Sequence, residues 1–119
     1  MKYTVSLKQN HEFRRLYNKG KSAVSPCLAL YCRKTGRETS RLGITVGAKL
    51  GHAVERNRVR RRIREVYRLH ESRFSPGWDI VVVARTRAVT ASFDQLTESY
   101  LSLAARAGIL EAAEEVPIC

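Results

Sequence analysis

The sequence predicts a small α/β (α+β) two-layer sandwich with a mixed sheet and the element order α-β-β-α-β-α. Two segments, 22–33 and 41–47, place apolar residues at every second position, as strands with one buried face do. A nearly continuous apolar run over 78–85 predicts a central strand covered on both faces. Apolar residues recur every three and four positions in 53–70, which predicts an amphipathic helix joining two of these strands by a parallel crossover.

The length of the chain limits how many such units it can form. Its 119 residues fit one domain over 1–119. We expect an ordered core over about 7–110. The tail 111–119 holds three acids and a proline, and we expect it to fray.

A short first helix is expected to begin at Asn10, which can cap it, and to end at Gly20. Phe13, Leu16 and Tyr17 then fall on one side of this helix. Two interpretations stay open at this point. Either these side chains anchor a core, or Phe13 and Tyr17 are partly exposed and stack on unpaired bases. The second is favoured by four basic neighbours, which are Arg14, Arg15, Lys19 and Lys21.

The two predicted strands with alternating apolar residues, 22–33 and 41–47, differ in their place in the sheet and in the face opposite the apolar residues. Pro26 has no amide proton to donate, so the strand in 22–33 is expected to begin at the sheet margin. In 41–47, residues such as Gly43 and Thr45 leave the face opposite the apolar residues nearly bare. That face could receive a ligand or a packed helix.

The helix expected over 53–70 has two contrasting sides. Its apolar stripe consists of Val59, Ile63, Val66, Tyr67 and His70. About half a turn away lies a polar ridge of Asn57, Arg61, Arg64 and Arg68. The guanidinium group can donate two parallel hydrogen bonds to a phosphate. An ordinary solvated face would interleave acids, whereas only Glu65 lies near this ridge, so we predict a nucleic-acid partner.

The last helix is expected to begin after Ser92, which can cap it, and to end at Gly108. Its apolar stripe consists of Phe93, Leu96, Tyr100, Leu103, Ala104 and Ala107. We therefore interpret it as a core helix.

The net charge of +11 predicts an anionic partner, and this charge is distributed unevenly along the chain. Residues 1–48 carry +8, residues 49–73 carry +6 and residues 74–119 carry −3. No apolar run is long enough to cross a membrane and no signal-peptide core is visible, so a cytoplasmic protein is expected. Three cysteines lack the spacing of a zinc site, and we expect reduced thiols. They are Cys27, Cys32 and Cys119.

No protein active site can be assembled from the sequence. His11, His52 and His70 lie in different segments, the acids are scattered, and Asp79 begins a strand alone. Hydrolysis by a protein needs an activated nucleophile with an acid and a base, or carboxylates that hold metal ions. We expect no catalytic residue, no metal ligands and no organic cofactor in this chain.

One ordered string resembles the signature helix of the protein subunit of bacterial ribonuclease P, in which an Arg-Asn-Arg triplet is the hallmark. The resemblance extends from about Leu7 to Leu110, and the string follows the strand 42–46 and precedes the strand 79–85. The string consists of Gly51, Ala53 and Val54, then Arg56-Asn57-Arg58, then Arg60-Arg61-Arg62-Ile63-Arg64.

This resemblance implies a function and a left-handed crossover. In the family, a catalytic RNA subunit uses Mg²⁺ to remove the 5′ leader of precursor tRNA, and one protein subunit binds that RNA and the leader. Matched residue by residue, the resemblance implies that the catalytic RNA is bound by Arg56, Asn57, Arg58, Arg60, Arg61, Arg64 and Arg68. It implies that the leader is bound by Phe13, Tyr17, Tyr31 and Lys49. The chain departs from the family where Ala48 replaces a second lysine and His52 replaces a commoner asparagine.

Three alternatives remain at this stage. A small basic ribosomal protein would share the high charge but would have no role in cleavage. A DNA-binding regulator would need a helix that sets the arginine helix in a major groove. A protein nuclease that needs no RNA would show metal-dependent cleavage by itself. No membrane and no obligate protein partner is expected.

Overall fold

The computed structural model describes residues 4–7 and 10–110. The tail 111–119, for which we predicted fraying, lies outside the described residues. The helices and strands are, in chain order, β1 (Thr4–Ser6), α1 (Asn10–Lys19), β2 (Lys21–Val24), β3 (Leu28–Lys34), β4 (Ser40–Thr45), α2 (Ala53–His70), β5 (Trp78–Ala84) and α3 (Phe93–Ala107), with short 3₁₀ turns at Ala48–Leu50, Glu71–Arg73 and Thr86–Ala88.

The five strands form one mixed sheet in the order β1-β4-β5-β3-β2. β4 is parallel to both β1 and β5, whereas β3 is antiparallel to both β5 and β2. β5 therefore lies at the centre, and Ile80, Val81 and Val82 are fully buried. This confirms the prediction of a central strand covered on both faces.

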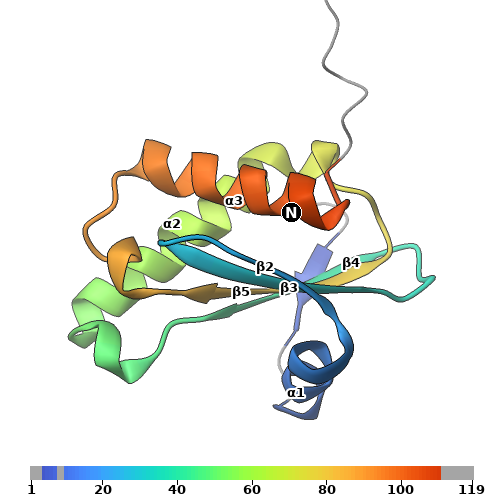
Figure 1. Cartoon of the computed structure of the whole chain (residues 1–119), viewed down its shortest axis with the longest axis horizontal. Coiled ribbons are helices and arrows are strands. Elements are labelled where there is room, and N and C mark those ends of the chain that lie inside the picture. Colours follow the sequence, from blue (N-terminus) through green and yellow to red (C-terminus); the bar gives the residue numbers. More distant parts are fainter. Residues whose placement is uncertain (1–3, 8–9, 111–119) are drawn as a thin grey trace, which may run out of the picture.

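The helices lie on both faces of the sheet (Figure 1). α2 and α3 cover one face, where Tyr67, Phe74 and Tyr100 form an aromatic cluster in the main core. α1 crosses the other face, where Leu16 packs with Leu7 and Val81. The predicted α+β class is confirmed, and α1 adds a partial third layer that the two-layer description left out.

The predicted element order was incomplete in two places. The segment 22–33 is not one strand but the antiparallel pair β2 and β3, which the chain joins by a turn at 25–27. Pro26 lies in this turn, beside the edge strand β2, so its predicted marginal position is confirmed. β1 was missed, because three residues carry almost no periodicity and the partner of β1 in the sheet, β4, begins 34 positions beyond the end of β1.

α2 has the bounds and the buried side that its periodicity predicted. Val59, Ile63, Val66 and Tyr67 are buried. His70, the last residue of the predicted stripe, is half-buried and its Nδ1 lies 2.9 Å from the carbonyl oxygen of Val66. The helix joins the parallel strands β4 and β5, as predicted. The left hand of this crossover stays a prediction.

α3 also begins and ends where its caps predicted. The Ser92 hydroxyl accepts a hydrogen bond from the backbone N–H of Gln95, and the Gln95 side chain accepts one from the backbone N–H of Ser92. Gly108 has a φ of 80°, a left-handed conformation that glycine adopts without strain at the end of a helix.

Candidate nucleic-acid interface

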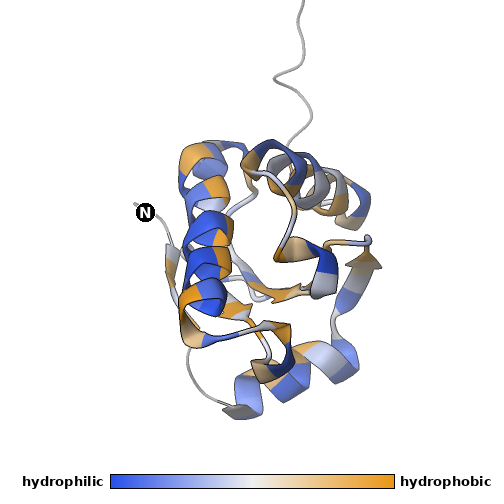
Figure 2. Ribbon diagram, turned by 90° about the vertical axis from the view of Figure 1, so that its left-hand side faces the viewer, coloured by the Kyte–Doolittle hydropathy of each residue, from blue (hydrophilic) through white to orange (hydrophobic). Residues whose placement is uncertain are grey.

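The predicted basic ridge lies on the exposed side of α2. Asn57, Arg61, Arg64 and Arg68 are all exposed, as is Arg58. In Figure 2, α2 is the steep helix at the left, with hydrophilic residues along its outer turns. The buried apolar stripe anchors the opposite side, so the arginine side chains are exposed to solvent without disturbing the core.

The arginines of α2 differ in how free they are to bind a phosphate. Arg68 donates two hydrogen bonds to Glu65, at 2.8 and 2.6 Å, and these bonds lower the pKa of that carboxyl group. Arg62 donates to the carbonyl oxygen of Ala91, at 3.1 Å, and so ties α2 to the segment before α3. In the part of the chain that the structure describes, Arg61 has no such partner. Arg61 is therefore free to bind a phosphate. Arg68 would bind one only by giving up its ion pair with Glu65 or with a charge that Glu65 partly neutralises.

The predicted Arg-Asn-Arg triplet is not uniformly displayed. Asn57 and Arg58 are exposed, whereas Arg56 is half-buried. The Nε atom of Arg56 is buried and has no hydrogen-bond partner among the described residues. The Asn57 Oδ1 atom accepts a hydrogen bond from Arg60, at 3.0 Å, which orients that guanidinium group along the helix.

Arg60 and Arg64 also line a small hollow of about 200 Å³ beside the sheet. β1 pairs with β4 only as far as Leu42, and no strand in the described part of the chain pairs with this edge of β4 beyond that point. The other residues that line the hollow are Ser6, Leu7, Leu42, Gly43 and Ile44. The basic surface of α2 therefore continues onto the edge of the sheet.

The three predicted leader-binding aromatic residues come together on the opposite face of the sheet. Tyr17 packs edge-on against Tyr31, with ring centroids 4.9 Å apart, and lies 6.5 Å from the ring of Phe13. The Tyr17 hydroxyl lies 3.3 Å from the Thr45 hydroxyl oxygen of β4. Leu16 is the buried anchor of α1, at 1% exposed, whereas Tyr17 is 39% exposed. Leu16 therefore anchors α1 in the core, while the exposure of Tyr17 is compatible with base stacking, which stays a prediction.

A hollow of about 350 Å³ opens at this aromatic group, a volume at the lower end of the range for ligand pockets. It is lined by Phe13, Tyr17, Arg14 and Thr45. Arg14 and Thr45 were not among the predicted leader contacts. Thr45 carried a usable signal, since it lies on the strand face that was predicted to be bare.

Lys49, the fourth predicted leader contact, does not line this hollow. It is exposed in the 3₁₀ turn Ala48–Leu50 that joins β4 to α2, and Ala48 beside it is exposed as well. The backbone N–H of His52 donates to the Glu55 carboxylate, at 2.7 Å, so His52 begins α2 without an asparagine. The assignment of Lys49 to the leader therefore stays a prediction.

An ion-pair cluster fastens α1 to the sheet beside the aromatic group. Arg41 of β4 donates two hydrogen bonds to Asp79 of β5, at 2.8 and 2.7 Å, and a third to Glu12 of α1. The side chains of Arg41, Glu12 and Asp79 are only 18%, 18% and 10% exposed. The hydrogen bonds that Arg41 donates to Asp79 and Glu12 raise the pKa of Arg41, which stays charged. Since Glu12 precedes Phe13, this cluster sets where the aromatic residues lie.

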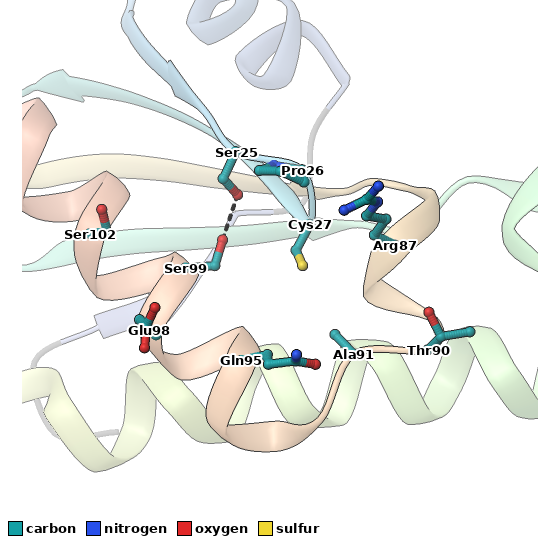
Figure 3. Close-up of a pocket in the computed structure, with 10 residues that line it drawn as sticks. All are labelled: Ser25, Pro26, Cys27, Arg87, Thr90, Ala91, Gln95, Glu98, Ser99 and Ser102. Atoms are coloured by element: carbon teal, nitrogen blue, oxygen red, sulfur yellow. Dashed lines mark hydrogen bonds between the residues drawn. The ribbon is translucent and has the colours of Figure 1, made fainter.

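A larger hollow, of about 720 Å³, lies between the β2–β3 turn and α3 (Figure 3). Hydroxyl groups dominate its lining, and Ser25 and Ser99 are hydrogen-bonded to each other across it. Arg87 and Glu98 contribute opposite charges. With one carboxylate, one arginine and no aromatic ring in its lining, this hollow is poorly suited to a polyanion.

The acidic side chains do not suit a magnesium ion. Within residues 4–7 and 10–110, no group of three or more His, Cys, Asp or Glu side chains is placed to hold a metal. Glu12 and Asp79, the acids nearest the aromatic group, are both bound to Arg41. A hard dication such as Mg²⁺ needs free carboxylate or carbonyl oxygens, so this donor set does not fit one.

None of the helices in the described part of the chain is long and apolar enough to span a membrane.

Comparisons with known proteins agree with this geometry. Residues 1–108 match the family model described as Ribonuclease P. The ribonuclease P protein component of Clostridioides difficile is 41% identical over 107 residues, which cover 89% of this chain and 94% of that protein. The ribonuclease P protein of Staphylococcus aureus, in a structure at 2.0 Å, has a TM-score of 0.82 at 34% identity, covering 89% of this chain and 97% of the other. The ribonuclease P protein of Thermotoga maritima has a TM-score of 0.75 at 32% identity, covering 82% and 92% of the two chains. This chain, with an arginine ridge on one side of its sheet and an aromatic hollow on the other, belongs to the ribonuclease P protein family.

Proposed function

We propose that this protein is the protein component of a ribonuclease P ribonucleoprotein, an endoribonuclease that matures the 5′ end of tRNA. The observation that supports the proposal is the presence of two different surfaces on opposite sides of one sheet, each with side chains that suit RNA. The ridge of α2 offers guanidinium groups, which suit the phosphates of a folded RNA. The group formed by Phe13, Tyr17 and Tyr31 offers aromatic rings, which suit unpaired bases.

In this proposal the cleavage chemistry belongs to the RNA subunit. It is supported by one finding: among the described residues, no group of three or more His, Cys, Asp or Glu side chains is placed to hold a metal ion. Magnesium would be held by the RNA subunit and the substrate. The protein contributes binding and orientation, with one copy for each RNA.

The role of the protein is then to choose the substrate and to lower electrostatic repulsion. The catalytic RNA and the precursor tRNA are both polyanions, so a chain of net charge +11 that contacts both of them favours their association. The catalytic RNA contacts Arg56, Asn57, Arg58, Arg60, Arg61, Arg64 and Arg68. The aromatic residues and Lys49 contact the single-stranded leader. Mature tRNA has no leader, so these contacts favour the precursor.

The test is cleavage of precursor tRNA at low, near-physiological magnesium and moderate salt. The protein alone, a bacterial ribonuclease P RNA alone, and the two together are compared. Cleavage at the mature 5′ end should be efficient only when both are present. If the protein adds nothing to the RNA, the proposal is wrong and a ribosomal role becomes the better explanation, although no observation favours it now.

Variants of α2 test whether the ridge is the RNA surface. The Arg61→Ala change removes an unpaired charge, so it should weaken RNA assembly and flatten the dependence of log affinity on log salt by roughly one unit. Arg68→Ala should have a smaller effect, because Glu65 already neutralises Arg68. Arg62→Ala is the matched control on the same helix, since it should lower stability through the lost bond to Ala91 and leave the salt dependence nearly unchanged. Equal salt effects of all three changes would contradict this assignment.

A further inference from the structure

Arg14 is one of the residues that line the aromatic hollow, and its side chain has no hydrogen bond or ion pair within residues 4–7 and 10–110. It follows Phe13 and precedes Tyr17 by three residues, a spacing that places two side chains next to each other on a helix. With these residues and Thr45 it lines the hollow of about 350 Å³. Arg14 is exposed, and among the residues that the structure describes no acid pairs with it. The carboxylate nearest to it in sequence, that of Glu12, is bound to Arg41.

The hollow already has the other parts of a site for a single-stranded nucleotide. Tyr17 is exposed enough to stack on a base, and both its contact with Tyr31 and its hydrogen bond to Thr45 hold the ring in place. A fixed ring loses little freedom on binding. Sites for unpaired nucleic acid combine such rings with a cation that tracks the backbone. Arg14 is the cation that lines this hollow.

We propose that Arg14 binds a phosphate of the single-stranded leader next to a base stacked on Tyr17, and so helps to discriminate precursor from mature tRNA. The inference rests on the proposed function and adds a specificity-determining residue to it. The planar guanidinium group of Arg14 can bind a phosphate in a bidentate manner while the base stays on the ring.

Arg15 provides a matched control one position further along the chain. It has the same charge, lies on the same helix and is also exposed, but it is not among the residues that line the hollow. Successive helical residues point about 100° apart, so Arg15 is directed away from Tyr17. A long-range effect of charge would be shared by both arginines, whereas a bound phosphate would belong to Arg14 alone.

The experiment measures the affinity of the assembled protein–RNA holoenzyme for precursor tRNA and for mature tRNA over a series of monovalent salt concentrations. With Arg14→Ala, precursor affinity should fall roughly three- to tenfold, and the slope of log affinity against log salt should flatten by about 0.7, the value for one phosphate contact on a single strand. Mature tRNA affinity should not change. Arg15→Ala should alter precursor affinity by less than about twofold, and Arg14→Lys should keep most of the slope because it keeps the charge.

Three outcomes would overturn the inference. Equal losses from Arg14→Ala and Arg15→Ala would show a general charge effect. An equal loss of mature tRNA binding would show that Arg14 does not contact the leader. An unchanged slope with Arg14→Ala would show that no phosphate contact was lost. If the unmodified holoenzyme shows no preference for precursor tRNA, the proposed function itself fails, which is a different result. Thermal unfolding of each variant shows whether α1 is still folded.

Discussion

Gly43 offers a direct test of whether the position of Phe13 controls leader binding. Gly43 lies in β4, beneath α1, and has no positive φ, so alanine would fit its backbone. A Cβ atom at this position would lie 2.7 Å from Cε1 and Cζ of the Phe13 ring and 3.3 Å from the Cβ atom of Leu7. Contacts this short cannot persist, so the Gly43→Ala change must displace the ring of Phe13.

The size of the effect follows from which atoms have to move. Overpacking a core costs about 1–3 kcal/mol, and we expect the lower end, about 1 kcal/mol, because the tip of a ring beside a hollow can swing away. The midpoint of thermal unfolding should then fall by roughly 4–6 °C. Since stacking of one base on an aromatic ring contributes about 1–3 kcal/mol, precursor affinity should fall by roughly fivefold or more. Mature tRNA affinity should stay the same.

Gly47 supplies the control for this change. It has a φ of −66°, and a Cβ atom there would meet nothing within 4 Å. The Gly47→Ala change should therefore alter the free energy of unfolding by less than about 0.5 kcal/mol and leave binding unchanged. The assays are thermal unfolding of the free protein and holoenzyme binding to both tRNA forms. The reasoning is refuted if Gly43→Ala keeps full preference for precursor tRNA, or if Gly47→Ala loses it equally.

Two further predictions concern buried groups. Arg41→Met should lower the free energy of unfolding by about 2–3 kcal/mol, because it leaves the carboxylates of Glu12 and Asp79 unpaired and mostly buried. Urea denaturation measures this change. An unchanged free energy of unfolding would show that the cluster does not hold α1 on the sheet. Burial raises the pKa of the Cys32 thiol from 9.0 to about 11. The folded state therefore favours the protonated thiol, and the stability that this preference contributes is complete below about pH 9 and is lost as the pH rises towards 11. In the folded protein at pH 8, iodoacetamide should alkylate the half-buried Cys27 well before Cys32, as mass spectrometry of the peptides can show; equal labelling would contradict the burial of Cys32.

The elements that could be predicted from sequence are those whose pattern is local and long. α2 repeats its apolar residues over 18 positions, and its bounds agree with the prediction. The turn at 25–27 was hidden because apolar residues keep alternating through it, so one long strand and a hairpin look alike. Pro26 was the one signal of a break, and it was interpreted as a marginal position within a strand. β1 has only three residues and pairs with a strand far along the chain, so nothing local identifies it.

The sequence predicted which types of residue form the candidate site better than it predicted where those residues lie in the fold. The bare face of β4 was predicted to admit a ligand or a packed helix, and it does admit α1 at Gly43. Arg14 could not be distinguished from three other basic residues nearby, because its role depends on the contact of α1 with Thr45. Arg61 and Arg68 look equivalent in the sequence and differ only through the ion pair with Glu65. Lys49 was assigned to the leader by resemblance. The sequence could not show that Lys49, four residues after Thr45, does not line the hollow.

β4 is the element that joins the two proposed RNA surfaces. Its side chains alternate, so Leu42 and Ile44 pack in the core beneath α2 and α3, while Gly43 contacts Phe13 and Thr45 contacts Tyr17. The chain then leaves β4 through one short turn and enters α2 directly. A displacement of β4 would therefore move both surfaces together, although each one lies on its own side of the sheet. On the proposed function, binding of the catalytic RNA along α2 and binding of the leader at α1 can each occur without blocking the other, and this strand is a direct structural link between them.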